Sequence, residues 1–419
     1  MVRLWFLLVS SFVCLAGQAQ QTITLEQCYA SARETYPLIS QKTLQEQIGS
    51  LNVKSIQTNR YLPQLAINGQ ASWQNEVTQL PVHIPNVEIT PLSKDQYKLT
   101  LDANYILFDG STASAQTQLQ RASVVVEQQK IEVELNKLKD QVNVYYLNAL
   151  LLDENIALTK VLQEDLKARM DKLSAGVKYG TSIQSNVDVL QAEYLKADQR
   201  LIEMEASRKG FRDMLALLTG LSIDQNTTLQ MPQTAIVSQE IKRPESQLFN
   251  YQKTIFESQT RLINSKSTPR ISAFIQTGYG RPALNFLSNE FKGLFIGGIR
   301  LNWNLSNLYT MKNEKSVLRL NQQLIDSQKG VFDKNLTIQL RQQQTEIDKL
   351  QGLITKDNEL VALRSRIKTT SAAQLENGVT TASDYVNDLN AENQAKLNQK
   401  IHEFQLLMAQ ITYRTVTGN

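Results

Sequence analysis

The sequence contains very little cysteine and histidine, with two residues of each among 419. One cysteine, Cys28, stands among Leu25, Tyr29 and Ala32 at helical spacing, so we predict a buried structural thiol. The two histidines are far apart in the sequence, which argues against a zinc site or a Cys/His nucleophile. Most carboxylates neighbour Lys or Arg on expected helix surfaces. We therefore predict no metal, no cofactor, no catalytic residue and no enzyme activity.

Charge of one sign and long apolar runs are scarce as well. Charged residues make up 20% of the chain and the net charge is +4, without a basic block, so we expect no nucleic-acid partner. Beyond the N-terminus no apolar run reaches the roughly eighteen residues that a spanning helix needs. The N-terminus has Arg3, an apolar stretch over 4–15, and small residues at Gly17 and Ala19. This pattern predicts a cleaved signal peptide over 1–19 rather than a buried helix.

Proline and glycine are missing where a long helix is expected. Proline is absent from Leu92 to Met231, and glycine is absent between Gly110 and Gly176. This predicts one continuous helix over about 111–175, about 98 Å long at 1.5 Å per residue. Two apolar seams with alternating steps of three and four residues follow it, so we expect neighbouring helices on two sides, as in a ring. The first seam is Leu135, Leu138, Val142, Tyr145, Ala149, Leu152 and Ile156. The second is Val144, Leu147, Leu151, Leu158 and Val161.

The chain repeats itself. The segment Leu101–Leu107 is similar to Ile299–Leu305, which begins 198 residues later. Tyr179-Gly180 and Thr219-Gly220 recur at the same offset as Asn377-Gly378 and Thr417-Gly418. Such self-similarity predicts a duplicated structural unit. The predicted segments are a first repeat over 20–220, a linker over 221–243, and a second repeat over 244–419.

Each repeat contains two segments in which apolar and polar residues alternate, as they do in strands with one face in an apolar environment. The predicted strands span about 61–73, 97–108, 270–280 and 294–305. Asp102 and Arg300 hold equivalent positions on the polar face, which predicts a water-filled lumen. Phe274 and Ile106 interrupt that face. The alternative is a half-buried hairpin on a soluble core.

Aromatic residues end the apolar faces of these strands. We predict that Trp73, Tyr105 and Trp303 lie at a membrane boundary and face lipid. Four strands cannot close a barrel, and an open edge in lipid would leave backbone groups unpaired at several kcal/mol each. Spanning strands would therefore require several copies of the chain. Three copies would supply about twelve strands, enough for a channel.

The order helix, strand, strand, long helix, turn, helix occurs twice, and it resembles the TolC outer-membrane efflux family. Four segments carry the resemblance across nearly the whole mature chain: Thr22–Ala30, Tyr61–Leu65, Tyr105–Gly110 and Glu376–Val379. The first is similar to the family's opening helix and the second to its helix-to-strand junction. The third resembles the exit into the long helix, and the fourth resembles the turn at the periplasmic tip.

The resemblance implies a mainly α fold with a membrane β part. In a homotrimer, long antiparallel helices would form a periplasmic α-barrel, and four strands per chain would contribute to a twelve-stranded outer-membrane β-barrel. It implies a passive exit channel in a Gram-negative outer membrane that works with a periplasmic adaptor protein and an inner-membrane pump in efflux or type I secretion. The loops 74–96 and 281–292 would face outward. The alternative is a secreted coiled-coil envelope or adhesive protein without a pore, which leaves the strands unexplained.

The resemblance also places two helix-to-helix turns at the periplasmic tip, about 176–183 with Gly180 and about 376–381 with Gly378. The family's closed state uses an Asp in the first turn and a Tyr and an Arg in the second. The matching positions here are Asn186, Leu375 and Thr380. We therefore predict that this lock is absent in that form.

Two carboxylates remain near the second turn, Asp384 and Asp388, one helical turn apart. With Asn186 they are the candidate residues of a constriction at the tip. In one interpretation, copies of both carboxylates form a ring that attracts cations. In the other, Asp384 caps the helix that follows the turn. The sequence leaves both interpretations open.

Overall fold

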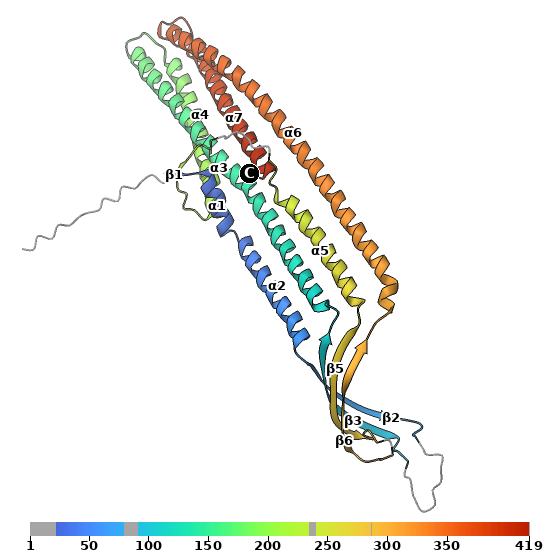
Figure 1. The fold of residues 1–419 in the computed structure, drawn as a ribbon. Coiled ribbons are helices and arrows are strands. Elements are labelled where there is room, and N and C mark those ends of the chain that lie inside the picture. The colour runs from blue at the N-terminus through green and yellow to red at the C-terminus, as the bar shows by residue number, and fades with distance from the viewer. Residues whose placement is uncertain (1–21, 79–90, 234–239, 286, 419) are drawn as a thin grey trace, which may run out of the picture. The chain divides into compact units, whose positions relative to one another are not determined.

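The computed structural model describes residues 22–78, 91–233, 240–285 and 287–418 (Figure 1). The predicted signal peptide over 1–19 and part of the first predicted outer loop lie outside these residues. The helices are α1 (Leu25–Thr35), α2 (Leu38–Tyr61), α3 (Thr112–Lys178), α4 (Gln184–Thr219), α5 (Pro244–Lys266), α6 (Ser306–Glu376) and α7 (Ala382–Thr417). The strands are β1 (Thr22–Ile23), β2 (Gln64–Trp73), β3 (Asp95–Phe108), β4 (Thr228–Leu229), β5 (Arg270–Arg281) and β6 (Lys292–Asn302). The predicted fold class, mainly helical with a small β part, is confirmed.

Some element boundaries differ from the predicted ones for local reasons. Strand β2 begins at Gln64 because α2 continues through Tyr61 and proline follows at 63. Helix α6 begins at Ser306 rather than near 310. At Ser306 the backbone N–H donates a hydrogen bond to the side chain of Asn304 at 3.1 Å. Strand β6 ends at Asn302 because the chain leaves the sheet before this helix.

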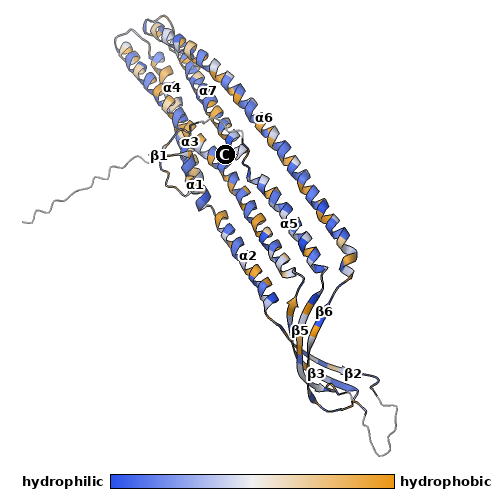
Figure 2. Cartoon of the chain, viewed as in Figure 1, coloured by the Kyte–Doolittle hydropathy of each residue, from blue (hydrophilic) through white to orange (hydrophobic). Residues whose placement is uncertain are grey.

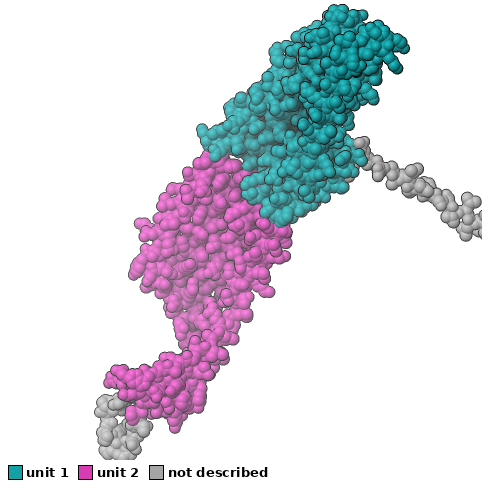
Figure 3. All heavy atoms as spheres, turned by 180° about the vertical axis from the view of Figure 1, so that it is seen from behind, with its two compact units in different colours: residues 1–39, 134–243, 334–419 teal, residues 40–133, 244–333 magenta. Residues whose placement is uncertain are grey.

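The chain divides into two compact units, which are not the two sequence repeats (Figure 3). The first unit takes residues 1–39, 134–243 and 334–419, and the second takes 40–133 and 244–333. Each unit therefore contains segments of both repeats. The sequence repeats divide the chain by the order of its elements, whereas the compact units divide it by which elements pack together.

In the first unit the duplication is visible in the backbone. Helices α4 and α7 both have 36 residues, and both their ends are related by the 198-residue offset. Each ends at a glycine in the left-handed region, with φ of 69° at Gly220 and 88° at Gly418. Glycine adopts this conformation without the steric cost that a Cβ atom brings. The sequence offset therefore corresponds to a repeat of helix length and helix termination.

The core of the first unit is built around α1 and the middle of α3. Cys28 is fully buried there with Val142, Tyr146 and Leu215, and burial raises the pKa of its thiol to about 12. The prediction of a structural cysteine is confirmed. The thiol remains protonated at neutral pH and contributes packing rather than reactivity.

One buried arginine fixes the segment after α4. Arg212, 4% exposed, donates to the backbone carbonyls of Asp224 at 2.7 Å and Thr227 at 2.9 Å. Its other terminal nitrogen pairs with Asp153 of α3 at 2.8 Å. A buried charge needs such partners, because an unpartnered one costs several kcal/mol. This arrangement holds the segment that carries β4 against α3, and β4 in turn pairs in parallel with β1.

The first apolar seam of α3 is buried as predicted. Leu135, Leu138, Val142 and Ala149 are all less than 7% exposed. The second seam is mixed: Leu147 is buried, whereas Val144 is 44% exposed and Val161 is 62% exposed. The helices mix apolar and polar residues along their lengths (Figure 2). Within the described residues, none of the helices is both long and apolar enough to cross a membrane.

The second unit contains an antiparallel sheet with the order β2-β3-β5-β6. A β-bulge between Ile106 and Phe108 interrupts the pairing of β3 with β5. Arg60, near the end of α2, donates to the carbonyl of Ile106 at 2.7 Å and to that of Leu107 at 3.2 Å. It also pairs with Asp109 at 3.5 Å. Arg60 therefore binds carbonyls at the bulge, where the ladder is disrupted, and fixes the exit of β3 toward α3.

Candidate functional site

The four-stranded sheet has one mainly apolar face and one face that is mostly polar on β2 and β3 but mixed on β5 and β6, where Phe274, Leu294 and Ile296 lie on it. The register pairs Leu101 with Ile67 on one side and with Thr277 on the other, and side chains opposite each other share a face. Large apolar side chains cover one face and are highly exposed in the single chain: Leu65, Ile67, Phe295, Ile299 and Leu301 are 65–74% exposed. A sheet with this much exposed apolar surface requires an apolar environment or a partner.

On the polar face, Asp102 is held by two amides from neighbouring strands. Its carboxylate accepts hydrogen bonds from Asn68 Nδ2 of β2 at 2.5 Å and from Gln276 Nε2 of β5 at 2.7 Å. The residue faces away from the apolar side, as predicted. Two amide donors thus satisfy the carboxylate oxygens, and such a polar group suits a surface in contact with water.

Arg300 lies on the same polar face, on β6 opposite Ser272. Its guanidinium carbon is 4.6 Å from the ring centroid of Phe274 on β5. This cation–π contact accounts for the phenylalanine that interrupts the polar pattern, because the arginine covers the ring. Among the described ion pairs none joins Arg300 to Asp102.

The predicted boundary aromatics lie at two ends of the sheet. Trp73 ends β2 opposite Asp95, at the loop end. Tyr105 and Trp303 lie at the opposite end, where the strands join the helices, and Trp303 Nε1 donates to the carbonyl of Ser267 at 3.0 Å. Sequence reasoning missed a cluster at the loop end, formed by Tyr97, Tyr279 and Phe291. Their position at the ends of an alternating pattern was the signal that could have revealed them.

The two turns between long helices share one backbone geometry. Gly180 and Gly378 have φ of 75° and 68°. The N–H of Thr181 donates to the carbonyl of Gly176 at 2.8 Å, and Val379 donates to Gln374 at the same distance. This bond satisfies a helix-terminal carbonyl that would otherwise have no partner. The 198-residue repeat therefore reaches the level of individual hydrogen bonds.

The helices that follow the two turns begin differently. Asn186 and Asp384 occupy the same position of their helices, since α4 and α7 are related by the 198-residue offset. Thr381 and Asp384 form a reciprocal capping box, in which the Asp384 N–H donates to Thr381 Oγ1 at 3.1 Å. The hydrogen bond from the Thr381 hydroxyl, at 2.7 Å, holds the pKa of Asp384 below its usual value. At Ile183, the equivalent of Thr381, no side-chain cap forms.

The other residues predicted at the second turn have separate environments. Asp388 lines a hollow of about 390 Å³ between α6 and α7, together with Leu363, Arg366 and Gln374. Leu375 is buried, 6% exposed, in the apolar core behind the turn. The structure therefore assigns Asp384 the capping geometry, while Asp388 lies against the neighbouring helix.

Sequence reasoning also missed an ion cluster in the same unit. Asp165 of α3 lies 3.1 Å from Arg169 and 3.3 Å from Lys368 of α6. The hydroxyl of Tyr385, on α7, donates to Asp165 at 3.3 Å, and the Arg169 guanidinium lies 4.6 Å from its ring centroid. Burial, followed by the charge of Asp165, raises the pKa of Tyr385. Three helices are thus joined by one group of charges near the turns.

This cluster continues along α7. Glu392, 4% exposed, lies 2.8 Å from Lys396 and 3.4 Å from Lys368. Burial alone would raise the pKa of Glu392, but the hydrogen bond from Lys396 and the charge of Lys368 lower it. Glu392 is therefore a buried carboxylate that remains ionised because two cations compensate it.

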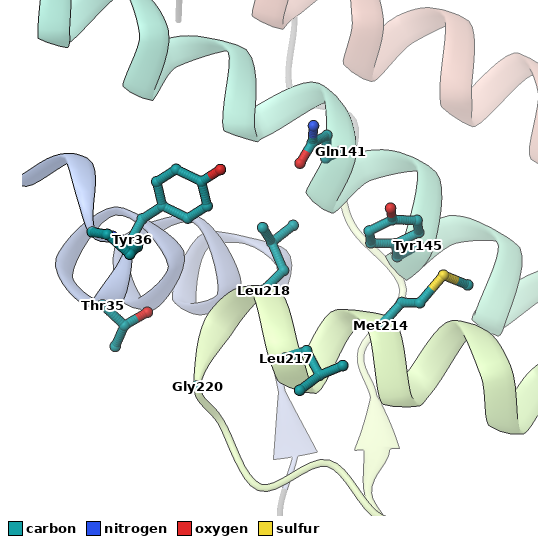
Figure 4. Close-up of a pocket in the computed structure, with 9 residues that line it drawn as sticks. Thr35, Tyr36, Gln141, Tyr145, Met214, Leu217, Leu218 and Gly220 are labelled. Atoms are coloured by element: carbon teal, nitrogen blue, oxygen red, sulfur yellow. The ribbon is translucent and has the colours of Figure 1, made fainter.

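A separate hollow of about 400 Å³ opens on the first unit near the end of α1 (Figure 4). Tyr36, Gln141, Tyr145 and Leu218 surround it, and Leu217 at its rim is 86% exposed. Within the described residues no group of three or more Cys, His, Asp or Glu could hold a metal ion. Among the described residues that line the hollow, none is a cysteine, a histidine or a charged residue.

Solved structures with this arrangement of elements include outer-membrane channels. The chain superposes on the transmembrane channel CusC with a TM-score of 0.68 at 13% identity, over 94% of this chain and 91% of that one. It superposes on the outer-membrane channel CmeC of Campylobacter jejuni with a TM-score of 0.65 at 11% identity, over 94% and 85%. For the open state of the MtrE outer-membrane channel of Neisseria gonorrhoeae the values are 0.63 and 15%, over 94% and 89%.

No protein-family model matches the sequence, and no curated protein matches it. The likeness is therefore one of fold, and it extends over nearly the whole chain. The predicted resemblance is confirmed at that level: this chain has the fold of the TolC-like outer-membrane channels.

Proposed function

We propose that this protein is an outer-membrane channel, a passive exit duct without catalytic activity. The observation that carries the proposal is the sheet, whose apolar face is exposed and whose opposite face carries most of its polar side chains. A strand of ten residues such as β2 is about 33 Å long. At the tilt of roughly 35–45° found in membrane barrels, it would cover the apolar band of about 25 Å. Aromatic side chains at both ends of the sheet match the two boundaries of such a band.

The sheet of one chain is open at both edges, β2 and β6. In lipid these edges would leave backbone groups without partners. We propose that three copies close the barrel, each pairing its β2 with β6 of the next. The exposed members of the second seam, Val144 and Val161, support neighbours from other copies along the helices as well.

Within such a barrel, Asp102 and Arg300 would face the lumen, while Trp73, Tyr105 and Trp303 would face lipid at its boundaries. The turns at Gly180 and Gly378 would form the periplasmic end. There a periplasmic adaptor and an inner-membrane pump would engage the duct, and Asp384, Asp388 and Asn186 would lie near the narrowest point. The fold of the solved outer-membrane channels supports this assignment.

Neighbouring residues on opposite faces of β2 provide the test. Ile67→Lys places a charge on the proposed lipid face, where a lysine at the midplane costs about 2–4 kcal/mol. Ala66→Lys places the same charge on the lumen face, opposite Asp102. We expect the Ile67 variant to be lost from the outer-membrane fraction, and the Ala66 variant to assemble and to conduct in planar bilayers.

Equal assembly of both variants would remove the membrane assignment. A soluble wild-type protein without conductance would favour the coiled-coil envelope protein instead. The protein used is the full chain, because the two units have segments in common helices.

A further inference from the structure

The loop end of the sheet has a positive charge on its apolar face. Tyr97 and Tyr279 both stack on Phe291, with ring centroids 6.2 Å and 6.0 Å apart. The guanidinium carbon of Arg281 lies 5.0 Å from the Phe291 centroid and 5.7 Å from that of Tyr97. The side chain of Arg281 is thus held against aromatic rings on the face that the proposed function directs toward lipid.

A hollow of about 480 Å³ lies beside these rings. Gly69 and Ala71 of the edge strand β2 border it, with Leu99 from β3 and the rings of Tyr97 and Phe291. A Cβ atom added at Gly69 would meet only Leu99, at 3.7 Å. The small residues therefore leave open space rather than allow close packing. The lining also includes Tyr279, Gln70 and Lys98. Arg281 is not part of the lining, but it lies against two of the rings that border the hollow, Tyr97 and Phe291.

The charge of Arg281 is not neutralised within the described part of the chain. Its Nη2 atom has two long contacts, both 3.5 Å, to Ser93 Oγ and to the carbonyl of Asp95. Its Nε atom is buried without a hydrogen-bond partner, and no described carboxylate lies within 4.0 Å as an ion-pair partner. A cation at the edge of an apolar face is costly unless it meets an anion or reaches water.

We propose that this hollow binds a phosphate-bearing lipid, with an acyl chain against the apolar walls and the phosphate on Arg281. The inference rests on the proposed membrane function. The planar guanidinium suits a phosphate, because two of its N–H groups can donate to two oxygens at once. The position at the end of the strands is the level at which head groups begin.

A second copy of this chain is the competing occupant, because β2 is an edge strand. The apolar face of β6 would present Gly293, Phe295 and Gly297 to it. None of these side chains carries a negative charge, so the apolar face of β6 in a neighbouring copy could fill space but would offer Arg281 no anion. Charge complementarity therefore favours the lipid.

Lipid retention on the purified full-length protein tests the site by native mass spectrometry. The probes are phosphatidylglycerol and a diacylglycerol with the same acyl chains but no phosphate. We expect the wild type to favour phosphatidylglycerol by about tenfold, the effect of one charge-assisted phosphate contact. The preference should disappear in Arg281→Gln. Arg300→Gln is the matched control, because it removes an arginine that covers a ring on the opposite face.

Filling the hollow sharpens the result. Ala71→Phe should weaken retention of both lipids, since it acts on the acyl chain. Equal preference for phosphatidylglycerol in the wild type and in Arg281→Gln would overturn the site. Retention of neither lipid by the assembled wild type would overturn it too, because the neighbouring copy would then fill the hollow.

Conductance of the same preparations separates the two proposals. Normal channels without a lipid preference would refute the lipid site alone. Absence of channels from the wild type would refute the proposed function and the lipid site with it.

Discussion

The two turns between long helices have the same backbone and different side chains. Gly180 and Gly378 share a left-handed conformation and equivalent hydrogen bonds. The helix after the second turn begins with a Thr381–Asp384 capping box, whereas the helix after the first begins at Ile183 without a side-chain cap. The two copies of the duplicated unit have thus kept the glycine and the backbone hydrogen bonds that set the geometry of the turn. The polar side chains that follow the turn differ between the copies.

The largest difference in stability between the turns should come from the residue that follows Asp384 and its equivalent in the first turn. Tyr385 is fully buried and contacts the ion cluster, whereas its equivalent, Val187, is only partly buried. We expect Tyr385→Ala to destabilise the protein by about 3–5 kcal/mol, as for other large buried rings. Val187→Ala should cost about 1 kcal/mol. Denaturant unfolding monitored by circular dichroism measures both. Similar losses would mean that the ion cluster and its tyrosine do not distinguish the second turn.

The two glycines should respond alike. A Cβ atom at Gly180 or Gly378 would meet nothing within 4 Å, so only backbone strain opposes alanine. That strain is about 1–2 kcal/mol for a left-handed residue. We expect equal losses of unfolding free energy in Gly180→Ala and Gly378→Ala. A difference of more than about 1 kcal/mol would indicate that one turn has a further partner, since the backbone term is common to both.

A further difference is the side-chain cap, which can be removed from the second turn or added to the first by one substitution. Thr381→Ala removes the hydroxyl that accepts from the Asp384 N–H, which should cost about 1 kcal/mol. Ile183→Thr supplies the missing cap in the first turn and should stabilise α4 by up to about 1 kcal/mol. Thermal unfolding of both variants gives the comparison. If Ile183→Thr is destabilising, apolar contacts of Ile183 must outweigh the cap.

Ion selectivity distinguishes the two interpretations of Asp384. A carboxylate ring at a narrow axis would make the channel cation-selective, and Asp384→Asn with Asp388→Asn would reduce that selectivity. The equivalent first-turn residue is already Asn186, so Asn186→Asp is the reciprocal change and should increase it. Reversal potentials in planar bilayers under a salt gradient measure the effect. Unchanged selectivity together with lower stability would leave Asp384 as a helix cap alone.

The smallest expected effect is a pH dependence confined to the second turn. The pKa of Asp384 is lowered by the Thr381 hydroxyl, so the folded state binds a proton less readily than the unfolded chain. The stabilisation is present above the unfolded pKa, about 3.9, and is lost as the pH falls through the folded value. The difference in melting temperature between the wild type and Asp384→Asn should therefore shrink below about pH 4. A constant difference from pH 7 to pH 2 would contradict this linkage.

Periodic features of the sequence predicted most of the fold. The alternation from Leu99 to Leu107 marked β3, and the absence of glycine after Gly110 marked α3. The bulge beside Leu107 was not predictable, because Arg60 stabilises it from an element that lies more than forty residues earlier. Local pattern specifies an element, whereas its irregularities depend on tertiary contacts.

The candidate site was predicted less completely for the same reason. Residues placed by the repeat, such as Asp102 and Arg300, lie on the predicted face. The cluster of Asp165, Lys368 and Tyr385 joins three helices, and no spacing within one helix indicates it. The capping role of Asp384 was visible in the Thr-x-x-Asp spacing. Its equivalence to Asn186 became visible only when α4 and α7 were compared in the structure.

The two open edges of the sheet have a genetic consequence. If three chains close one barrel, each chain contributes both a β2 edge and a β6 edge, and every joint involves two different copies. A chain that folds normally but carries a proline in one edge strand would still join its neighbours elsewhere and would leave one seam open. Such an allele would be dominant. At equal expression and random assembly, only about one trimer in eight would contain wild-type chains alone.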